Sequence, residues 1–252
     1  MASYQDFYYK IYKNTEAKHR LIFLHGWGLD HKSLEQIATY FTDRYEVILI
    51  DQYGCGNSKA PNKALDSFAY AEIYQEFIQT LPSKENIWIG HSYGARVIIQ
   101  LTTNFPGLVE KAVFIAGAGL KRKRSIYFKI KAKILKLLGS SCKIIDKIFN
   151  TKLKEVFANK FGSSDYKAAK GFMRETLIKA VTEDLSNKLA NINCPILLLY
   201  GSKDNVTPPE FGQIFEKAIR NSKLIMIKGA DHNSILSSYY PQLQNFIEEF
   251  LD

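Results

Sequence analysis

The stretch Gly90-His91-Ser92-Tyr93-Gly94 decides the fold of this chain. It follows the short apolar run Asn86–Ile89, which we predict to be a strand, and it leads into a helical pattern. A serine on so sharp a turn between strand and helix projects its hydroxyl from the sheet, and flanking glycines let the turn close. Unpaired backbone N–H groups at the helix start can stabilise negative charge nearby. The pattern therefore predicts that Ser92 is a nucleophile; the alternative is a serine that only caps the helix.

Short apolar strands alternate with helical patterns along the rest of the chain. This alternation predicts an α/β fold with a mostly parallel twisted sheet and helices on both faces. In such a sheet, functional loops leave the carboxyl ends of the strands. We predict strands at Phe7–Tyr12, Arg20–Leu24, Glu46–Ile50, Asn86–Ile89, Lys111–Ile115, Ile196–Tyr200 and Lys223–Ile227, and helices at Ser33–Tyr45, Ser67–Leu81, Ser92–Asn104, Pro209–Ile219 and Tyr240–Leu251.

Two later loops supply the partners that a serine nucleophile needs. A serine hydroxyl requires a base to accept its proton, and the base requires an acid to fix its tautomer. Asp204 and His232 each follow a predicted strand, so we expect both at the same sheet edge as Ser92. The alternatives are that Asp204 only initiates a turn and that His232 is an ordinary loop histidine. Asp231 competes for the acid role, but a neighbouring residue cannot easily present its carboxylate to the imidazole.

The run Leu24-His25-Gly26-Trp27-Gly28 follows another predicted strand. Its glycine-rich turn can present the Trp27 N–H to the nucleophile, and the Tyr93 N–H would be the second donor of an oxyanion hole. We expect His25 to support this loop through hydrogen bonds rather than to act as a base. For His19, His31 and His91 we expect structural or surface roles.

At this point the sequence resembles the α/β-hydrolase superfamily over the whole chain apart from one insert. The resemblance rests on motifs in a characteristic order: HGWG at 25–28, DQYGCGNS at 51–58, GHSYG at 90–94, GSKDNVTPP at 201–209 and GADHNS at 229–234. The run HGWGLD at 25–30 is similar to bacterial pimeloyl-carrier-protein methyl ester esterases, and GSSDYKAAKGFMRETL at 162–177 resembles small bacterial α/β hydrolases. The resemblance implies an α/β-hydrolase fold with a helical lid.

The same resemblance excludes some reactions of this superfamily. Haloalkane dehalogenases and epoxide hydrolases carry aspartate where this chain has Ser92. Carbon–carbon hydrolases of aromatic catabolism usually place tryptophan after the catalytic histidine, whereas Asn233 follows His232 here. Tyr93, after the serine, and Cys55, in the glycine turn, differ from the residues that the superfamily more often carries there, so they do not point to a particular subfamily.

A basic insert divides the chain. Within residues 117–190, 18 Lys and Arg residues stand against 6 Asp and Glu residues, a local charge of +12, whereas the remainder carries −3. The insert falls between the strands that end at Ile115 and begin at Ile196, where the resemblance implies a helical lid. We therefore expect a core domain made of residues 1–116 and 192–252, with residues 117–191 as the lid. In the insert, Ile126, Ile130, Ile134, Leu137 and Leu138 share one face of an amphipathic helix.

The insert can be interpreted in two ways. In the first, its apolar stripe packs on the core domain and roofs an acyl pocket, with the lysines solvated. In the second, its basic face binds an acidic carrier protein or anionic lipid headgroups. We do not expect nucleic acid as a partner, because no base-reading motif accompanies the lysines.

The predicted function is hydrolysis of a carboxylic ester, with an apolar acyl chain, through an acyl-enzyme on Ser92 and without a cofactor or metal. Acyl transfer or thioester or amide hydrolysis by the same triad is the alternative among enzymes, and a non-catalytic ligand-binding module is the alternative from another class.

The composition of the chain, with 46% hydrophobic and 23% charged residues, is that of a globular protein. Because Met1–Arg20 lacks the features of a signal peptide and the three cysteines are few and scattered, we expect a cytoplasmic protein.

Overall fold

The computed structural model describes residues 4–121 and 164–252, together with isolated positions between 134 and 156. Its core is a seven-stranded sheet in the order β1-β3-β2-β4-β5-β6-β7. β1 is antiparallel to β3, and every other neighbouring pair is parallel. The strands are β1 Tyr9–Tyr12, β2 His19–Leu24, β3 Glu46–Ile50, β4 Glu85–His91, β5 Lys111–Ile115, β6 Ile196–Gly201 and β7 Ser222–Ile227.

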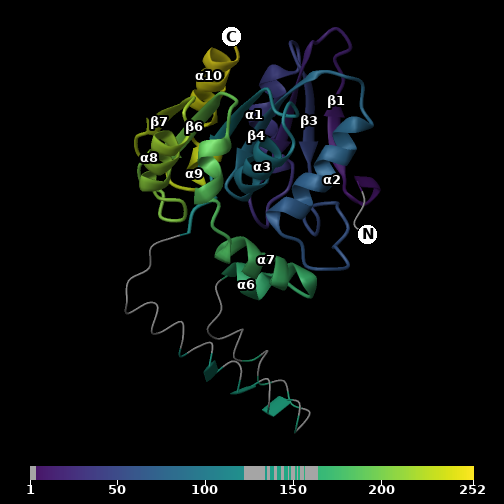
Figure 1. Ribbon diagram of the computed structural model, residues 1–252, viewed down its shortest axis with the longest axis vertical. Helices are drawn as coiled ribbons and strands as arrows, with labels where there is room; N and C mark the ends of the chain where they lie inside the picture. The colour runs from purple at the N-terminus through teal and green to yellow at the C-terminus, as the bar shows by residue number, and fades with distance from the viewer. Residues whose placement is uncertain are drawn as a thin grey trace.

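Helices cover both faces of this sheet (Figure 1). Alternate strand residues point to opposite faces, so Ile22 and Leu24 pack with α2, α3 and α8, whereas Leu21 and Phe23 pack with α1, α9 and α10. The fold is therefore the three-layer α/β arrangement that the apolar strands predict. The helices of these layers are α1 Lys32–Ala38, α2 Ser67–Gln79, α3 Tyr93–Asn104, α8 Pro209–Ala218, α9 Ser234–Ser237 and α10 Tyr240–Leu251, and short 3-10 helices lie at η1 Tyr4–Asp6, η2 Thr39–Phe41 and η3 Ser186–Asn191.

The strands Glu46–Ile50 and Lys111–Ile115 and the helix Tyr240–Leu251 have the predicted bounds. Several elements are shorter than predicted, and hydrogen bonds explain two of them. The first strand begins at Tyr9, because the backbone N–H of Tyr8 donates to Ser58 Oγ at 2.7 Å instead of to a strand. The helix predicted at Ser33–Tyr45 ends at Ala38 and tightens into η2, where the Thr42 hydroxyl donates to the Thr39 carbonyl at 2.9 Å.

The two ends of the insert lie next to each other where they join the core. The Leu185 N–H donates to the Gly119 carbonyl oxygen at 2.8 Å, which joins the two ends of this segment. Two further helices precede that point, α6 Ser164–Ala168 and α7 Phe172–Thr182, and in Figure 1 they lie below the sheet and its covering helices. The buried residues Leu185 and Leu189 pack in the same cluster as α3.

The apolar stripe predicted in the insert falls only partly on described residues. Ile126 and Ile130 lie outside them. Ile134, Leu137 and Leu138 are 52%, 61% and 49% exposed, so these side chains do not pack on the core domain as the first interpretation expects. Among the described residues, no helix has the length and apolar character needed to cross a membrane.

Gly94 offers a test of how closely α3 packs on the sheet. A Cβ at this position would run into the backbone oxygen of Leu24 at the end of β2. Gly94→Ala is therefore expected to lower the free energy of unfolding by about 1–3 kcal/mol, the usual cost of overpacking. Urea denaturation measures this difference, with Asn104→Ala at the exposed end of the same helix as the control. Equal stability of Gly94→Ala and the wild type would contradict the close packing.

Candidate active site

Ser92 lies on a strained turn between β4 and α3. Its backbone has φ 48° and ψ −106°, a positive φ that residues other than glycine seldom adopt. The turn is held because the Ser92 N–H donates to the Ile115 carbonyl at 3.0 Å and the Ser92 carbonyl accepts from Ala118 N–H at 3.0 Å. A Cβ at Gly90 would lie 2.7 Å from the Ala95 backbone nitrogen, so the tight turn requires glycine there. This is the conformation predicted from the Gly-x-Ser-x-Gly pattern.

Three predicted site residues, from loops far apart in the sequence, form one hydrogen-bonded row. His232 Nε2 lies 3.1 Å from Ser92 Oγ, and His232 Nδ1 lies 2.7 Å from Asp204 Oδ2. The Asp204 side chain is fully buried and that of His232 is 14% exposed, whereas Ser92 is 9% exposed. The row therefore runs from a buried carboxylate to a serine at the edge of the sheet, which is the geometry of an activated hydroxyl.

The Asp204 carboxylate is held as an anion by several donors. Its Oδ1 accepts the N–H groups of Val206 at 2.7 Å and Thr207 at 2.9 Å, while Oδ2 accepts from His232. Burial alone would raise the pKa of this carboxyl, but the hydrogen bond and charge of His232 and the two backbone donors lower it below its usual value. Asp204 thus also organises a turn, and the turn itself helps to keep it ionised.

Thr207 is a site residue that the sequence reasoning missed. Its hydroxyl lies 3.0 Å from Asp204 Oδ2 and 2.9 Å from the Ala116 carbonyl oxygen, and it is buried. Because a hydroxyl has one proton, it donates to one of these oxygens at a time. Thr207 therefore joins the acid loop to the end of β5. A signal was present in the sequence, since a threonine three residues after an aspartate is well placed to cap its turn.

Asp231 has a different set of partners from Asp204. Its Oδ1 accepts the N–H groups of Asn233 at 3.0 Å and Ser234 at 2.8 Å at the start of α9. These backbone donors lower the pKa of the Asp231 carboxyl, which is exposed. The carboxylate that accepts a hydrogen bond from His232 is therefore that of Asp204, whereas the Asp231 carboxylate caps the adjacent helix turn.

Both residues chosen as oxyanion donors lie beside the serine. Tyr93 is the first residue of α3, so its N–H is among those that have no partner within the helix. Trp27 follows Gly26, at which a Cβ would lie 3.4 Å from the Ser92 Cβ. The rings of Trp27 and Tyr93 meet edge to face with centroids 5.5 Å apart. The loop after β2 thus passes next to the nucleophile, where the prediction requires it.

The remaining histidines have structural or surface settings. His25 Nε2 accepts the Gln52 N–H at 2.9 Å, so its Nδ1 carries the proton and donates to the Gly26 carbonyl at 2.7 Å, which joins the loops after β2 and β3. His31 Nδ1 lies 2.8 Å from Asp51 Oδ1 in a buried pair, and His19 meets Glu85 at the surface. Burial, with the nearby His232, lowers the pKa of His91 to about 3, so His91 is neutral at pH 7. None of the four contacts Ser92 Oγ as His232 does.

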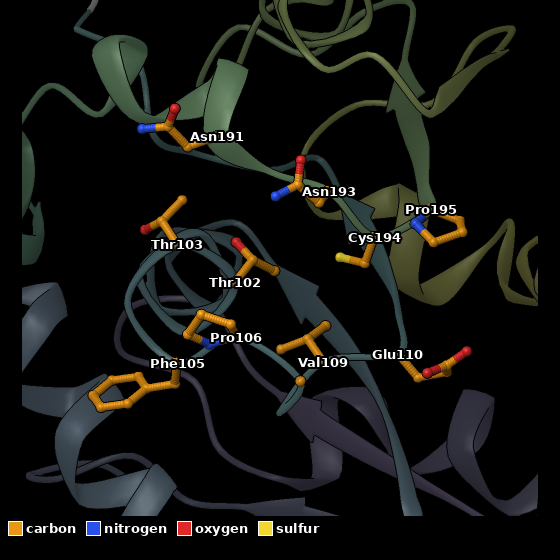
Figure 2. Close-up of a pocket in the computed structure, with 11 residues that line it drawn as sticks. Thr102, Thr103, Phe105, Pro106, Val109, Glu110, Asn191, Asn193, Cys194 and Pro195 are labelled. Atoms are coloured by element: carbon orange, nitrogen blue, oxygen red, sulfur yellow. The ribbon is translucent and has the colours of Figure 1, made fainter.

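A hollow of about 400 Å³ lies elsewhere, at the far end of α3 and beside the loops that enter β5 and β6 (Figure 2). Thr102, Thr103, Glu110 and Cys194 are among the residues around it. It is at the amino-terminal edge of the sheet, opposite the edge that carries Ser92, so it does not belong to the candidate site. Among the described residues, no cluster of His, Cys, Asp and Glu side chains is arranged to hold a metal.

Comparisons with known proteins agree with this fold. Residues 21–243 match the model of the Alpha/beta hydrolase family. The chain is 24% identical over 245 residues to a pimeloyl-[acyl-carrier protein] methyl ester esterase of Proteus mirabilis (strain HI4320), covering 90% of this chain and 92% of that protein. It is 28% identical over 234 residues to the AB hydrolase superfamily protein YisY of Bacillus subtilis (strain 168), covering 85% of each.

Among solved structures, an esterase from Exiguobacterium antarcticum superposes with a TM-score of 0.73 at 21% identity, covering 97% of this chain and 94% of that one. Since the family model spans nearly the whole chain and the strand order and the turn at Ser92 agree with it, this protein belongs to the α/β-hydrolase family.

Proposed function

We propose that this protein hydrolyses a carboxylic ester through an acyl-enzyme on Ser92. The single observation that carries the proposal is the hydrogen-bonded row from Asp204 through His232 to Ser92 Oγ, with distances of 2.7 and 3.1 Å. The Proteus mirabilis and Exiguobacterium antarcticum relatives are named as esterases, which supports the same reaction class.

The geometry suits a two-step acyl transfer. His232 Nε2 takes the Ser92 proton as Oγ attacks the ester carbonyl, and the Asp204 carboxylate holds the Nδ1 proton and stabilises the imidazolium that forms. His232 then gives its proton to the leaving alcohol, which departs and leaves the acyl group on Ser92. Water, deprotonated by His232, attacks this acyl-enzyme and releases the carboxylic acid.

The Trp27 and Tyr93 N–H groups are the proposed donors to the oxyanion of each tetrahedral intermediate. The half-buried Trp27 ring supports an apolar acyl chain, because it offers apolar area next to the nucleophile. It packs edge to face on Tyr93, which with Tyr53 and Tyr70 belongs to the buried core.

Ser92→Ala tests the nucleophile. It is expected to abolish turnover of p-nitrophenyl esters and labelling by a fluorophosphonate, because covalent catalysis requires the hydroxyl, while the thermal unfolding temperature stays close to that of the wild type. The non-catalytic binding alternative predicts no labelling of the wild type. Labelling that persists in Ser92→Ala would remove Ser92 from the mechanism.

The two neighbouring carboxylates can be separated by matched substitutions. Asp204→Asn is expected to reduce kcat about 10³- to 10⁴-fold, since the amide favours the wrong tautomer of His232. Asp231→Asn is the control and should cost far less, because Asp231 bonds the backbone at the start of α9. Steady-state kinetics on one ester measure both; the reverse ranking would assign the acid role to Asp231.

We also propose that the basic insert attracts an acidic carrier of the substrate. Its local charge of +12 supports this, and Lys121, which opens the basic run, is exposed. The name of the Proteus mirabilis relative includes an acyl-carrier protein, so we take an acidic carrier protein as the first candidate. The exposed Ile134, Leu137 and Leu138 would suit an anionic lipid surface instead.

Replacing Lys121, Arg122, Lys123 and Arg124 by glutamine tests this proposal. Arg122, Lys123 and Arg124 lie outside the described residues. The variant should turn over a carrier-linked ester more slowly and with less salt dependence, because surface attraction acts within a Debye length of about 8 Å at physiological salt. An ester in anionic vesicles forms a second arm, and a small neutral ester is the control. Equal loss on all three substrates would make the cluster structural, and no change on any would exclude recruitment.

A further inference from the structure

Four polar residues tie the end of the insert to the helix that follows the nucleophile. Arg96 and Gln100 lie on α3, Ser67 begins α2, and Glu183 follows α7; together we call them the clasp. Arg96 Nη1 donates to the Glu183 carbonyl oxygen at 3.2 Å and lies 3.5 Å from Glu183 Oε2. Ser67 Oγ donates to Glu183 Oε1 at 2.7 Å and accepts from Gln100 Nε2 at 3.0 Å.

The clasp carries charge in a place where charge is costly. The Arg96 side chain is 7% exposed and that of Glu183 is 18% exposed. A guanidinium removed from water in this way needs a paired carboxylate, and loss of either partner leaves the other uncompensated. The buried ion pair therefore requires both partners in this geometry, whereas the partners of an exposed ion pair can each be solvated by water.

The clasp is placed where the insert rejoins the core. Glu183 stands two residues before Leu185, whose N–H donates to Gly119 at the other end of the insert. Within α7, Thr176 Oγ1 accepts the Leu65 N–H at 3.0 Å, and Lys179 Nζ donates to the Ala64 carbonyl at 2.9 Å. The Met173 side chain fills the space at Gly54. The orientation of α7 on the core thus depends on its end at Glu183, on these polar contacts and on the buried Leu177 and Ala180.

The clasp lies on the helix that follows the nucleophile. Arg96 is one helical turn beyond Ser92 on α3, and Ser67 begins α2, whose Tyr70 ring meets the buried Tyr93 ring edge to face. The same two helices therefore carry both the clasp and the packed core beside the nucleophile.

We propose that Arg96 and Glu183 are positioning residues that fix α7 relative to α2 and α3 and so set the fit of longer acyl chains. This inference rests on the proposed ester hydrolysis. A short acyl group reaches only the atoms around Ser92, whereas a longer chain must also fit against α7, which lies below the sheet and its covering helices in Figure 1. Loss of the clasp should therefore weaken use of long esters and spare short ones.

The experiment compares Glu183→Gln, Arg96→Met and the charge-keeping Arg96→Lys. Glu183→Gln retains the shape and an oxygen for Ser67, so it removes charge with little change in volume. Arg44→Met is the matched control, because Arg44 forms an exposed ion pair with Glu248 away from the site. Each variant is assayed on p-nitrophenyl acetate and p-nitrophenyl octanoate, and hydrogen exchange is followed in residues 172–182 and, for comparison, in β4.

In Glu183→Gln and Arg96→Met, KM for octanoate should rise on the order of tenfold while kcat and KM for acetate change less than about twofold. Exchange in α7 should quicken, that in β4 should not, and Arg96→Lys should restore part of the octanoate effect. Equal losses of activity on both esters would show that the clasp only stabilises the fold. Unchanged activity on both esters would exclude a positioning role for the clasp. If the wild type hydrolyses neither ester, the proposed function fails, and unchanged α7 exchange in the variants would separately overturn the positioning role.

Discussion

The positive φ of Ser92 is the constraint on which the rest of the site depends. A strained residue of this kind costs about 1–3 kcal/mol and persists only where its surroundings hold it. Here β5 and the segment after it provide that hold, through Ile115 and Ala118, and Ala116 between them has a positive φ of its own, 47°. Two neighbouring strands, β4 and β5, are therefore each followed by a residue of positive φ, and the backbone of Ser92 is held by hydrogen bonds to both sides of Ala116.

The acid and the base are supported from the same edge. The Thr207 hydroxyl lies within hydrogen-bond distance of the Ala116 carbonyl oxygen and of the Asp204 carboxylate, and that carboxylate is hydrogen-bonded to His232. The ends of β4, β5 and β6 are thus joined through backbone and side-chain hydrogen bonds before any substrate binds. Such a preorganised row lowers the reorganisation needed when the serine proton moves, which is what electrostatic catalysis requires. The end of the insert is attached to this base through the clasp and through the buried Ala180, Leu185 and Leu189.

Most of the sheet and the row Ser92, Asp204 and His232 could be predicted from the sequence, because apolar strands and glycine-bounded turns are local signals. The turn-capping role of Thr207 had a local signal in its spacing from Asp204, but its hydrogen bond to the Ala116 carbonyl joins two distant loops and leaves no local pattern. The early end of the helix at Ala38 was missed because it depends on a threonine side chain that competes for a backbone carbonyl. The exposure of Ile134, Leu137 and Leu138 was opposite to the first interpretation, since helical periodicity identifies an apolar face but not what covers it. The clasp joins residues 67, 96, 100 and 183, a separation that only tertiary structure reveals.

In the proposed mechanism, catalysis passes through a covalent acyl group on Ser92. Rapid quenching in acid during turnover of a p-nitrophenyl ester, followed by mass spectrometry of the digested protein, measures this group directly. We expect an initial burst of p-nitrophenol and a peptide containing Ser92 whose mass is increased by one acyl group. An acyl group found on another residue, such as Cys55, or turnover with no acylated peptide when deacylation is slowed at low temperature, would contradict it.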